Sequence, residues 1–175
     1  MNNWFECKIR YEKESEKGKG KKVTETYLVD ALSFSEAEER ITKEMTPYLS
    51  GNFSILGIKK AAINEIFPNS EGDRWYKCKV NFVSIDEVNA TEKKIATNIL
   101  VLASDINGAW EHLQNAMKDT MSDYDVPIIS ETTIMDIFPY SPPQDGLSPD
   151  GLPPAPSEGG GAERILLLVQ LLLNI

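Results

Sequence analysis

The sequence is poor in the side chains on which most catalytic and metal sites depend. It has one histidine, His112, and two cysteines, Cys7 and Cys78. Nucleophilic arrangements of the Ser-His-Asp and Cys-His kinds would all need that single imidazole. Structural zinc sites need several cysteine or histidine ligands at short spacings, and the chain has neither a Cys-x-x-Cys motif nor a histidine pair. We therefore expect no catalytic residue, no metal site and no cofactor.

A glycine-rich phosphate-binding motif and an excess of positive charge are missing as well. Gly57 and Gly108 stand alone, so no glycine-rich loop is available to cradle a phosphate. The chain carries 18 basic and 27 acidic residues, which gives a formal net charge of −9. Binding of nucleic acid through overall charge is disfavoured, because phosphate contacts need clustered lysine and arginine. A local basic face is still compatible with this composition.

No apolar run approaches the roughly 20 residues that cross a bilayer. Residues 141–161 hold six of the ten prolines and are predicted to be a Pro/Gly-rich linker. Residues 162–175 are predicted to form a short apolar helix. This helix either docks into a groove of its own or another subunit or is a non-native extension, and a membrane is not the expected partner. The N-terminal residues lack the basic and apolar regions of a signal peptide, so we expect a cytoplasmic protein.

What the sequence does contain is an internal repeat. Trp4-Phe5-Glu6-Cys7-Lys8 is matched by Trp75-Tyr76-Lys77-Cys78-Lys79, and Ile66-Phe67-Pro68 is matched by Ile137-Phe138-Pro139. Self-similarity of this kind indicates two copies of one structural unit. It is informative about architecture and says little about chemistry.

Each copy is predicted to be a strand-strand-helix-strand (ββαβ) unit, the first at residues 1–70 and the second at 71–140. The predicted strands are 4–11, 23–31, 53–67, 75–82, 94–103 and 126–138, from their alternating or apolar patterns. The first predicted helix starts after Ser33, which has Glu36 at the spacing of a capping box, and the second spans about 105–121. The fold class is therefore α+β, with antiparallel sheet and two helices. One helix on three strands buries little apolar surface, so the units are expected to share a sheet or pack their helices about a pseudo-twofold axis.

The two cysteines occupy matched positions, each on the apolar side of an alternating strand. We interpret Cys7 and Cys78 as small buried hydrophobic residues in a reducing compartment, in preference to a disulfide or a metal pair.

One set of residues has the composition of a binding surface. The outward side of the two matched strands carries Trp4, Lys8, Arg10, Trp75, Lys77 and Lys79. Aromatic rings interleaved with cations can bind single-stranded nucleic acid, because bases stack on the rings while lysine and arginine follow the phosphates. The alternatives are that both tryptophans pack beneath the helix of the other unit, with the lysines covering apolar surface, or that the face binds protein.

Four stretches of the chain resemble a known family. They are Trp4 to Lys8, Tyr27 to Glu38, Asp73 to Lys77 and Ile134 to Tyr140. The family is an uncharacterised one of small proteins from gut Bacteroidetes and their phages, carried as a domain of unknown function, and the resemblance covers roughly residues 3 to 140. It implies a phage or mobile-element setting and supplies no catalytic or binding residues.

We therefore expect a non-enzymatic accessory binding protein of a phage or mobile element. The leading hypothesis for its ligand is single-stranded nucleic acid, bound on the Trp/Lys/Arg strand face. The alternative is a protein-interaction or self-assembly module that acts through sheet edges and the apolar C-terminal helix.

Overall fold

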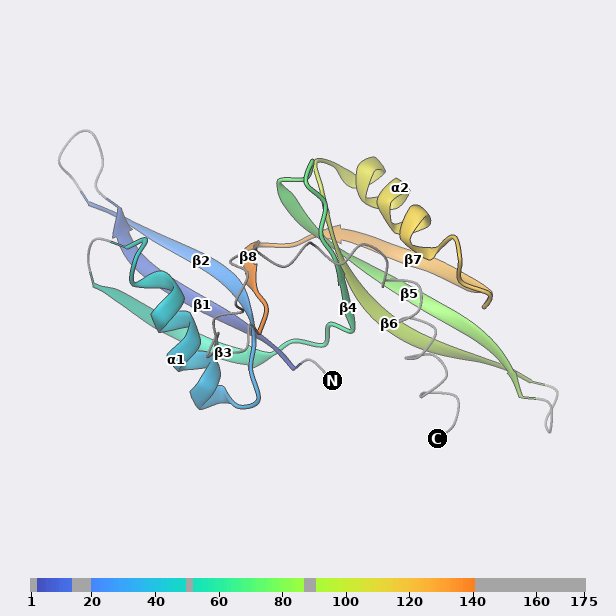
Figure 1. Ribbon diagram of the computed structural model, residues 1–175, viewed down its shortest axis with the longest axis horizontal. Coiled ribbons are helices and arrows are strands. Elements are labelled where there is room, and N and C mark those ends of the chain that lie inside the picture. Colours follow the sequence, from blue (N-terminus) through green and yellow to red (C-terminus); the bar gives the residue numbers. More distant parts are fainter. Residues whose placement is uncertain (1–2, 14–19, 50–51, 87–90, 141–175) are drawn as a thin grey trace, which may run out of the picture.

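The structure, a computed structural model, describes residues 3–13, 20–49, 52–86 and 91–140. The predicted linker at 141–161 and the predicted C-terminal helix at 162–175 lie outside the described residues. Within them the chain forms two four-stranded sheets, each covered by one helix (Figure 1). The elements of the first repeat are β1 (Trp4–Lys13), β2 (Lys21–Asp30), α1 (Phe34–Met45), β3 (Phe53–Lys60) and β4 (Glu65–Phe67). Those of the second are β5 (Arg74–Asp86), β6 (Thr91–Ala103), α2 (Ile106–Met117), β7 (Tyr124–Glu131) and β8 (Ile134–Phe138).

The two sheets exchange their last strands. The strand order is β3-β1-β2-β8 in the first sheet and β4-β6-β5-β7 in the second. All neighbours pair antiparallel except β8 with β2 and β4 with β6, which pair parallel. The closing strand of each repeat therefore completes the sheet of the other repeat. Figure 1 shows β4 and β8 in the centre of the molecule, with α1 and α2 on opposite outer sides.

The expected α+β class and the two similar repeats are confirmed, and the ends of the repeats differ from the prediction. Residues 53–67 and 126–138, each expected as one strand, are divided into β3 and β4 and into β7 and β8. The chain leaves the first sheet where the Ala61 N–H donates to the Trp4 carbonyl at 2.8 Å. It leaves the second where the Thr132 N–H donates to the Trp75 carbonyl at 2.9 Å. The two repeats are thus joined by exchange of strands between separate sheets.

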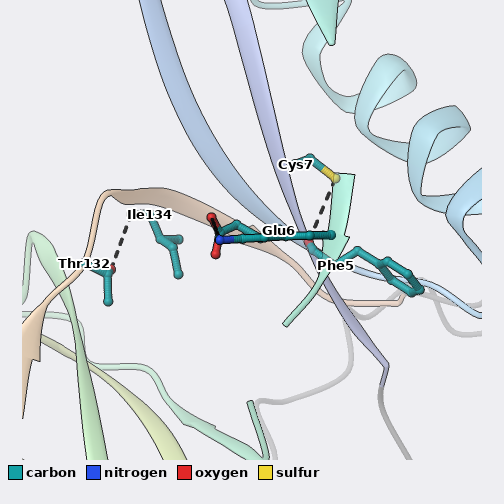
Figure 2. Close-up of polar contacts among 6 residues, drawn as sticks. Phe5, Glu6, Cys7, Thr132 and Ile134 are labelled. Carbon is teal, nitrogen blue, oxygen red and sulfur yellow. Dashed lines mark hydrogen bonds and ion pairs between the residues drawn. The ribbon is translucent and has the colours of Figure 1, made fainter. Parts of the chain in front are cut away.

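The turn before β8 is fixed by one side chain. The Thr132 hydroxyl donates to the Trp75 carbonyl at 2.8 Å and accepts from the Ile134 N–H at 3.3 Å. Figure 2 shows this second contact at the start of β8, close to the beginning of β1. Thr132 thereby fixes the turn that leads from β7 in the second sheet to β8 in the first.

Both helices begin where their capping residues predict. The Ser33 hydroxyl accepts from the Glu36 N–H at 3.2 Å, and the Asp105 carboxylate accepts from the Gly108 N–H at 2.7 Å. These contacts satisfy backbone donors that have no partner inside the helix. The buried stripe of each helix then packs on one face of its sheet: Ala37, Ile41 and Met45 in α1, and Ala109, Leu113 and Met117 in α2.

The Ile-Phe-Pro repeat explains how an exchanged strand is held. Phe67 of β4 packs in the core of the second repeat, with Cys78 and Leu113 among its neighbours. Phe138 of β8 packs against the core of the first repeat, where its ring stacks on Tyr27 with centroids 5.8 Å apart. Each phenylalanine thus anchors its strand in the apolar core of the opposite repeat.

Candidate functional site

The structure places both strand-start tryptophans in the interior. Trp4 is 5% exposed and Trp75 is 7% exposed, and they form one apolar cluster with Leu28 and Leu100. This inter-repeat core also takes up Ile66 and Ile137 of the exchanged strands, together with Ala61, Ile63, Leu102 and Ile134. No helix residue belongs to it, so the rings do not lie beneath the helix of the other unit as one alternative had it.

The burial of Trp4 and Trp75 limits the ligands that the matched strand face can bind. Alternation correctly put Trp4 and Trp75 on the side of each sheet that faces away from its own helix, but the other repeat covers that side around the two tryptophans. A base can stack only on a ring whose face is free. In this structure the two rings join the repeats and are not open for stacking, so the predicted platform keeps its cations and loses its aromatic surface.

The four cations of the predicted site are exposed. Lys8 and Arg10 lie on β1, and Lys77 and Lys79 lie on β5. The two pairs therefore belong to different sheets, and only the tryptophans are brought into one cluster. Within the described part of the chain, no ion pair or hydrogen bond of these four side chains is found. Their charges are consequently available to a ligand.

A bulge occurs at the same place in both repeats and creates a difference between them. In the first sheet the register shifts between Lys8 and Ile9, and in the second it shifts between Lys79 and Asn81. Next to the bulge, Gly57 of β3 stands opposite Lys8, whereas Ile128 of β7 stands opposite Lys79. The first sheet thus has no side chain where the second carries a half-exposed isoleucine.

The missing side chain leaves a hollow on the open face of the first sheet. Its volume is about 230 Å³, and its lining is Glu6, Lys8, Leu56, Gly57, Ile58 and Lys59. A Cβ atom built on Gly57 would meet nothing within 4 Å. The Lys59 ammonium pairs with the Glu6 carboxylate at 2.9 Å, which leaves Lys8 as the uncompensated charge of the hollow. Leu56 is 42% exposed and supplies apolar surface beside it.

The hollow borders an open sheet edge. β3 and β7 are outer strands of their sheets, and an edge strand presents unpaired backbone N–H and C=O groups. The two edges differ in chemistry: β3 contains Lys59 and Lys60 with no acidic residue and no proline, whereas β7 contains Asp125, Glu131 and Pro127 with no basic residue. Proline removes a backbone donor and protects an edge, and the lysines and the bulge of β3 protect an edge as well. Among the outer strands, which also include β8 and β4, β3 is the one that borders the hollow.

Sequence reasoning missed Arg40, which holds the end of the exchanged strand β8. From α1, its guanidinium donates to the Asp30 carbonyl and, at 2.9 Å, to the Pro139 carbonyl. It also lies 5.4 Å from the centroid of the Tyr140 ring. Only the match with His112 hinted at a shared role. His112, at the matched position of α2, is half-buried, and its Nδ1 lies 3.4 Å from the Leu102 carbonyl.

The two cysteines are free thiols with no exposed surface, as predicted. Burial raises the pKa of each to about 11, and for Cys7 the neighbouring Glu6 adds to the effect. A thiol with a raised pKa is protonated at neutral pH and is a poor nucleophile or metal ligand. Figure 2 shows the Cys7 sulfur directed at the Phe5 carbonyl, 3.9 Å away. Both thiols therefore serve as packing residues.

Within the described residues, no three His, Cys, Asp or Glu side chains come together as ligands of a metal ion. Over the same ranges, no helix is both long enough and apolar enough to reach across a membrane.

Two α+β repeats that complete each other's sheets, with cations on an open strand face, define a duplicated small-sheet module. The chain belongs to the family described as Domain of unknown function (DUF4494), whose model matches residues 3–140. The match confirms the expected membership of a domain family of unknown function, while the phage setting stays a prediction. No curated protein matches the chain.

Proposed function

We propose that this protein is a non-enzymatic interaction module that binds another polypeptide on the open face and free edge of its first sheet. The observation that carries the proposal is the surface around Lys8. There, two exposed cations, Lys8 and Arg10, lie beside a hollow that opens along the edge strand β3. Of the two roles expected from the sequence, this is the alternative one.

The burial of the tryptophans favours a polypeptide over nucleic acid as the ligand. Sequence-tolerant binding of single strands relies on stacking, which contributes on the order of 1–3 kcal/mol per base. With Trp4 and Trp75 in the inter-repeat core, a nucleic acid would have to be held by charge alone, against a net charge of −9. A polypeptide can instead use the backbone groups of an edge strand as well as the local cations.

Fluorescence anisotropy with three labelled probes tests the proposal: decaglutamate, decalysine and an oligothymidine of similar length. We expect decaglutamate to bind and the other two not to bind. The variant Lys8→Glu with Arg10→Glu should abolish binding, and the matched variant Lys77→Glu with Lys79→Glu should retain it. Binding of oligothymidine with no binding of decaglutamate would reinstate the nucleic-acid hypothesis. Loss of binding only in the second variant would move the site to the other sheet.

A further inference from the structure

The hollow beside Gly57 can be compared with the matched position in the second repeat of the same molecule. The two repeats have the same bulge, the same lysine beside it and an edge strand in the same place. At the matched position one repeat has Gly57 and the other has Ile128. Gly57 meets no crowding that would require a glycine, and glycine weakens the interior of a strand. Packing within the fold therefore does not explain this residue.

Resting on the proposed function, we propose that β3 binds an extended acidic peptide as an additional strand, with one aliphatic side chain of the peptide seated in the Gly57 hollow. Strand addition gives affinity through backbone hydrogen bonds and specificity through pockets for alternate side chains. β3 supplies both parts, because it is an outer strand of eight residues and the hollow opens beside it.

Charge identifies the peptide as acidic. The hollow and the surface next to it on the same face contain Lys8, Arg10 and Lys59, and the single acidic residue that lines the hollow, Glu6, is already paired with Lys59. A glutamate or aspartate of the ligand would gain a charge-assisted contact with Lys8. A basic peptide would meet like charges along the edge.

Size and surface chemistry identify the inserted side chain as aliphatic. Leu56, which is 42% exposed, provides apolar surface at the hollow. The volume of about 230 Å³ has room for a valine or leucine side chain. Because side chains two positions apart on a strand point to the same face, a glutamate two positions from the aliphatic residue lies on the face of Lys8 and the hollow. The preferred sequence is therefore an acidic one with a single aliphatic residue, such as decaglutamate with one central valine.

The test uses the full chain and a labelled decapeptide of nine glutamates and one central valine (Glu-Val), with the peptide that has serine in place of the valine (Glu-Ser) as the match. We expect Glu-Val to bind more tightly than Glu-Ser. Gly57→Ile, which installs the residue of the second repeat, should weaken Glu-Val binding by about tenfold, since burial of an aliphatic side chain is lost. Ile128→Ala in β7 is the control and should leave binding unchanged. Gly57→Ala is the milder variant and should give a smaller loss.

Hydrogen exchange of the complex supplies a second readout that does not depend on the variants folding equally well. The amides of Phe53–Lys60 should exchange more slowly when Glu-Val is bound, and those of Tyr124–Glu131 should not change. Equal affinity of the wild-type chain and Gly57→Ile, or protection confined to β7, would overturn the inference while the proposed function stands. If neither acidic peptide nor decaglutamate binds, the inference and the proposed function fail together.

Discussion

At the scale of single residues, matched positions in the two repeats have kept their structural roles while changing their chemistry. Ser33 and Asp105 both cap a helix. Arg40 and His112 occupy matched positions of the two helices, and each side chain lies next to the backbone carbonyl of a β-strand residue. Such pairs could be predicted from the alignment of one repeat with the other. The match between Gly57 and Ile128 can also be read from that alignment. The hollow beside Gly57 cannot be predicted from it, because the hollow depends on the bulge, which the sequence does not indicate.

The buried thiols predict how stability depends on pH. In the folded chain the pKa of both Cys7 and Cys78 is raised from 9.0 to about 11. Below pH 9 the thiols are protonated in both states, and their contribution is complete. Above pH 9 the unfolded chain loses protons first, so the free energy of unfolding falls as pH rises toward 11. We expect a loss of about 1 kcal/mol per thiol between pH 8 and pH 10, measured by urea denaturation.

The double variant Cys7→Ala with Cys78→Ala isolates this effect. It should be less stable at pH 8, because it leaves small cavities, but its stability should fall less steeply up to pH 10. Tyr27 contributes to the remaining slope at higher pH, since burial and the neighbouring Glu25 raise the pKa of its hydroxyl. An identical slope in the variant and the wild-type chain would show that the thiols are not buried as described.

At the scale of elements, the sequence predicts which segments are strands and helices and fails to predict which strands pair. The alternation in Glu65–Phe67 and Ile134–Phe138 assigns faces to the side chains, and those faces are the same whichever sheet receives the strand. The partner is chosen by features distant in sequence, such as the stacking of Phe138 on Tyr27. The same limit explains the tryptophans, because one alternative had predicted that the other repeat covers them but had assigned the cover to its helix instead of to strand residues.

The turn into β8 predicts a specific cost for losing one hydroxyl. Thr132→Val keeps the shape of the side chain and removes the hydroxyl that donates to the Trp75 carbonyl and accepts from the Ile134 N–H. We expect the free energy of unfolding to fall by about 1–2 kcal/mol. Thr133→Val is the control, since Thr133 is exposed, and it should change stability by less than about 0.5 kcal/mol. Equal effects of the two variants in chemical denaturation would contradict this role of Thr132.

At the scale of the whole molecule, the exchange and the inter-repeat core make the halves depend on each other. Neither repeat has a complete sheet without the strand contributed by the other. At the joint, a Cβ atom on Gly72 would lie 2.5 Å from the Ala103 backbone nitrogen, so the connection after β4 packs directly on β6. The boundary predicted near residue 70 therefore separates two sequence repeats that share one folded structure.

Tryptophan fluorescence reports on that shared core. The chain has three tryptophans, and Trp110 on α2 is 43% exposed. In a Trp110→Phe variant the signal comes only from Trp4 and Trp75, and burial should give blue-shifted emission with little quenching by acrylamide. Red-shifted, strongly quenched emission in the folded variant would mean that the rings are exposed and would return them to the role of a stacking platform.

The most direct test of strand exchange is a crossed pair of substitutions followed by amide hydrogen exchange. Phe67→Leu lies in the first repeat but loosens β4, so it should speed exchange at Ile99 to Val101 of β6, its partners in the second sheet. Phe138→Leu should speed exchange at Tyr27 to Val29 of β2 in the first sheet. The structure predicts this crossed pattern. If each substitution instead loosened the sheet of its own repeat, the strands would not be exchanged and the account would be contradicted.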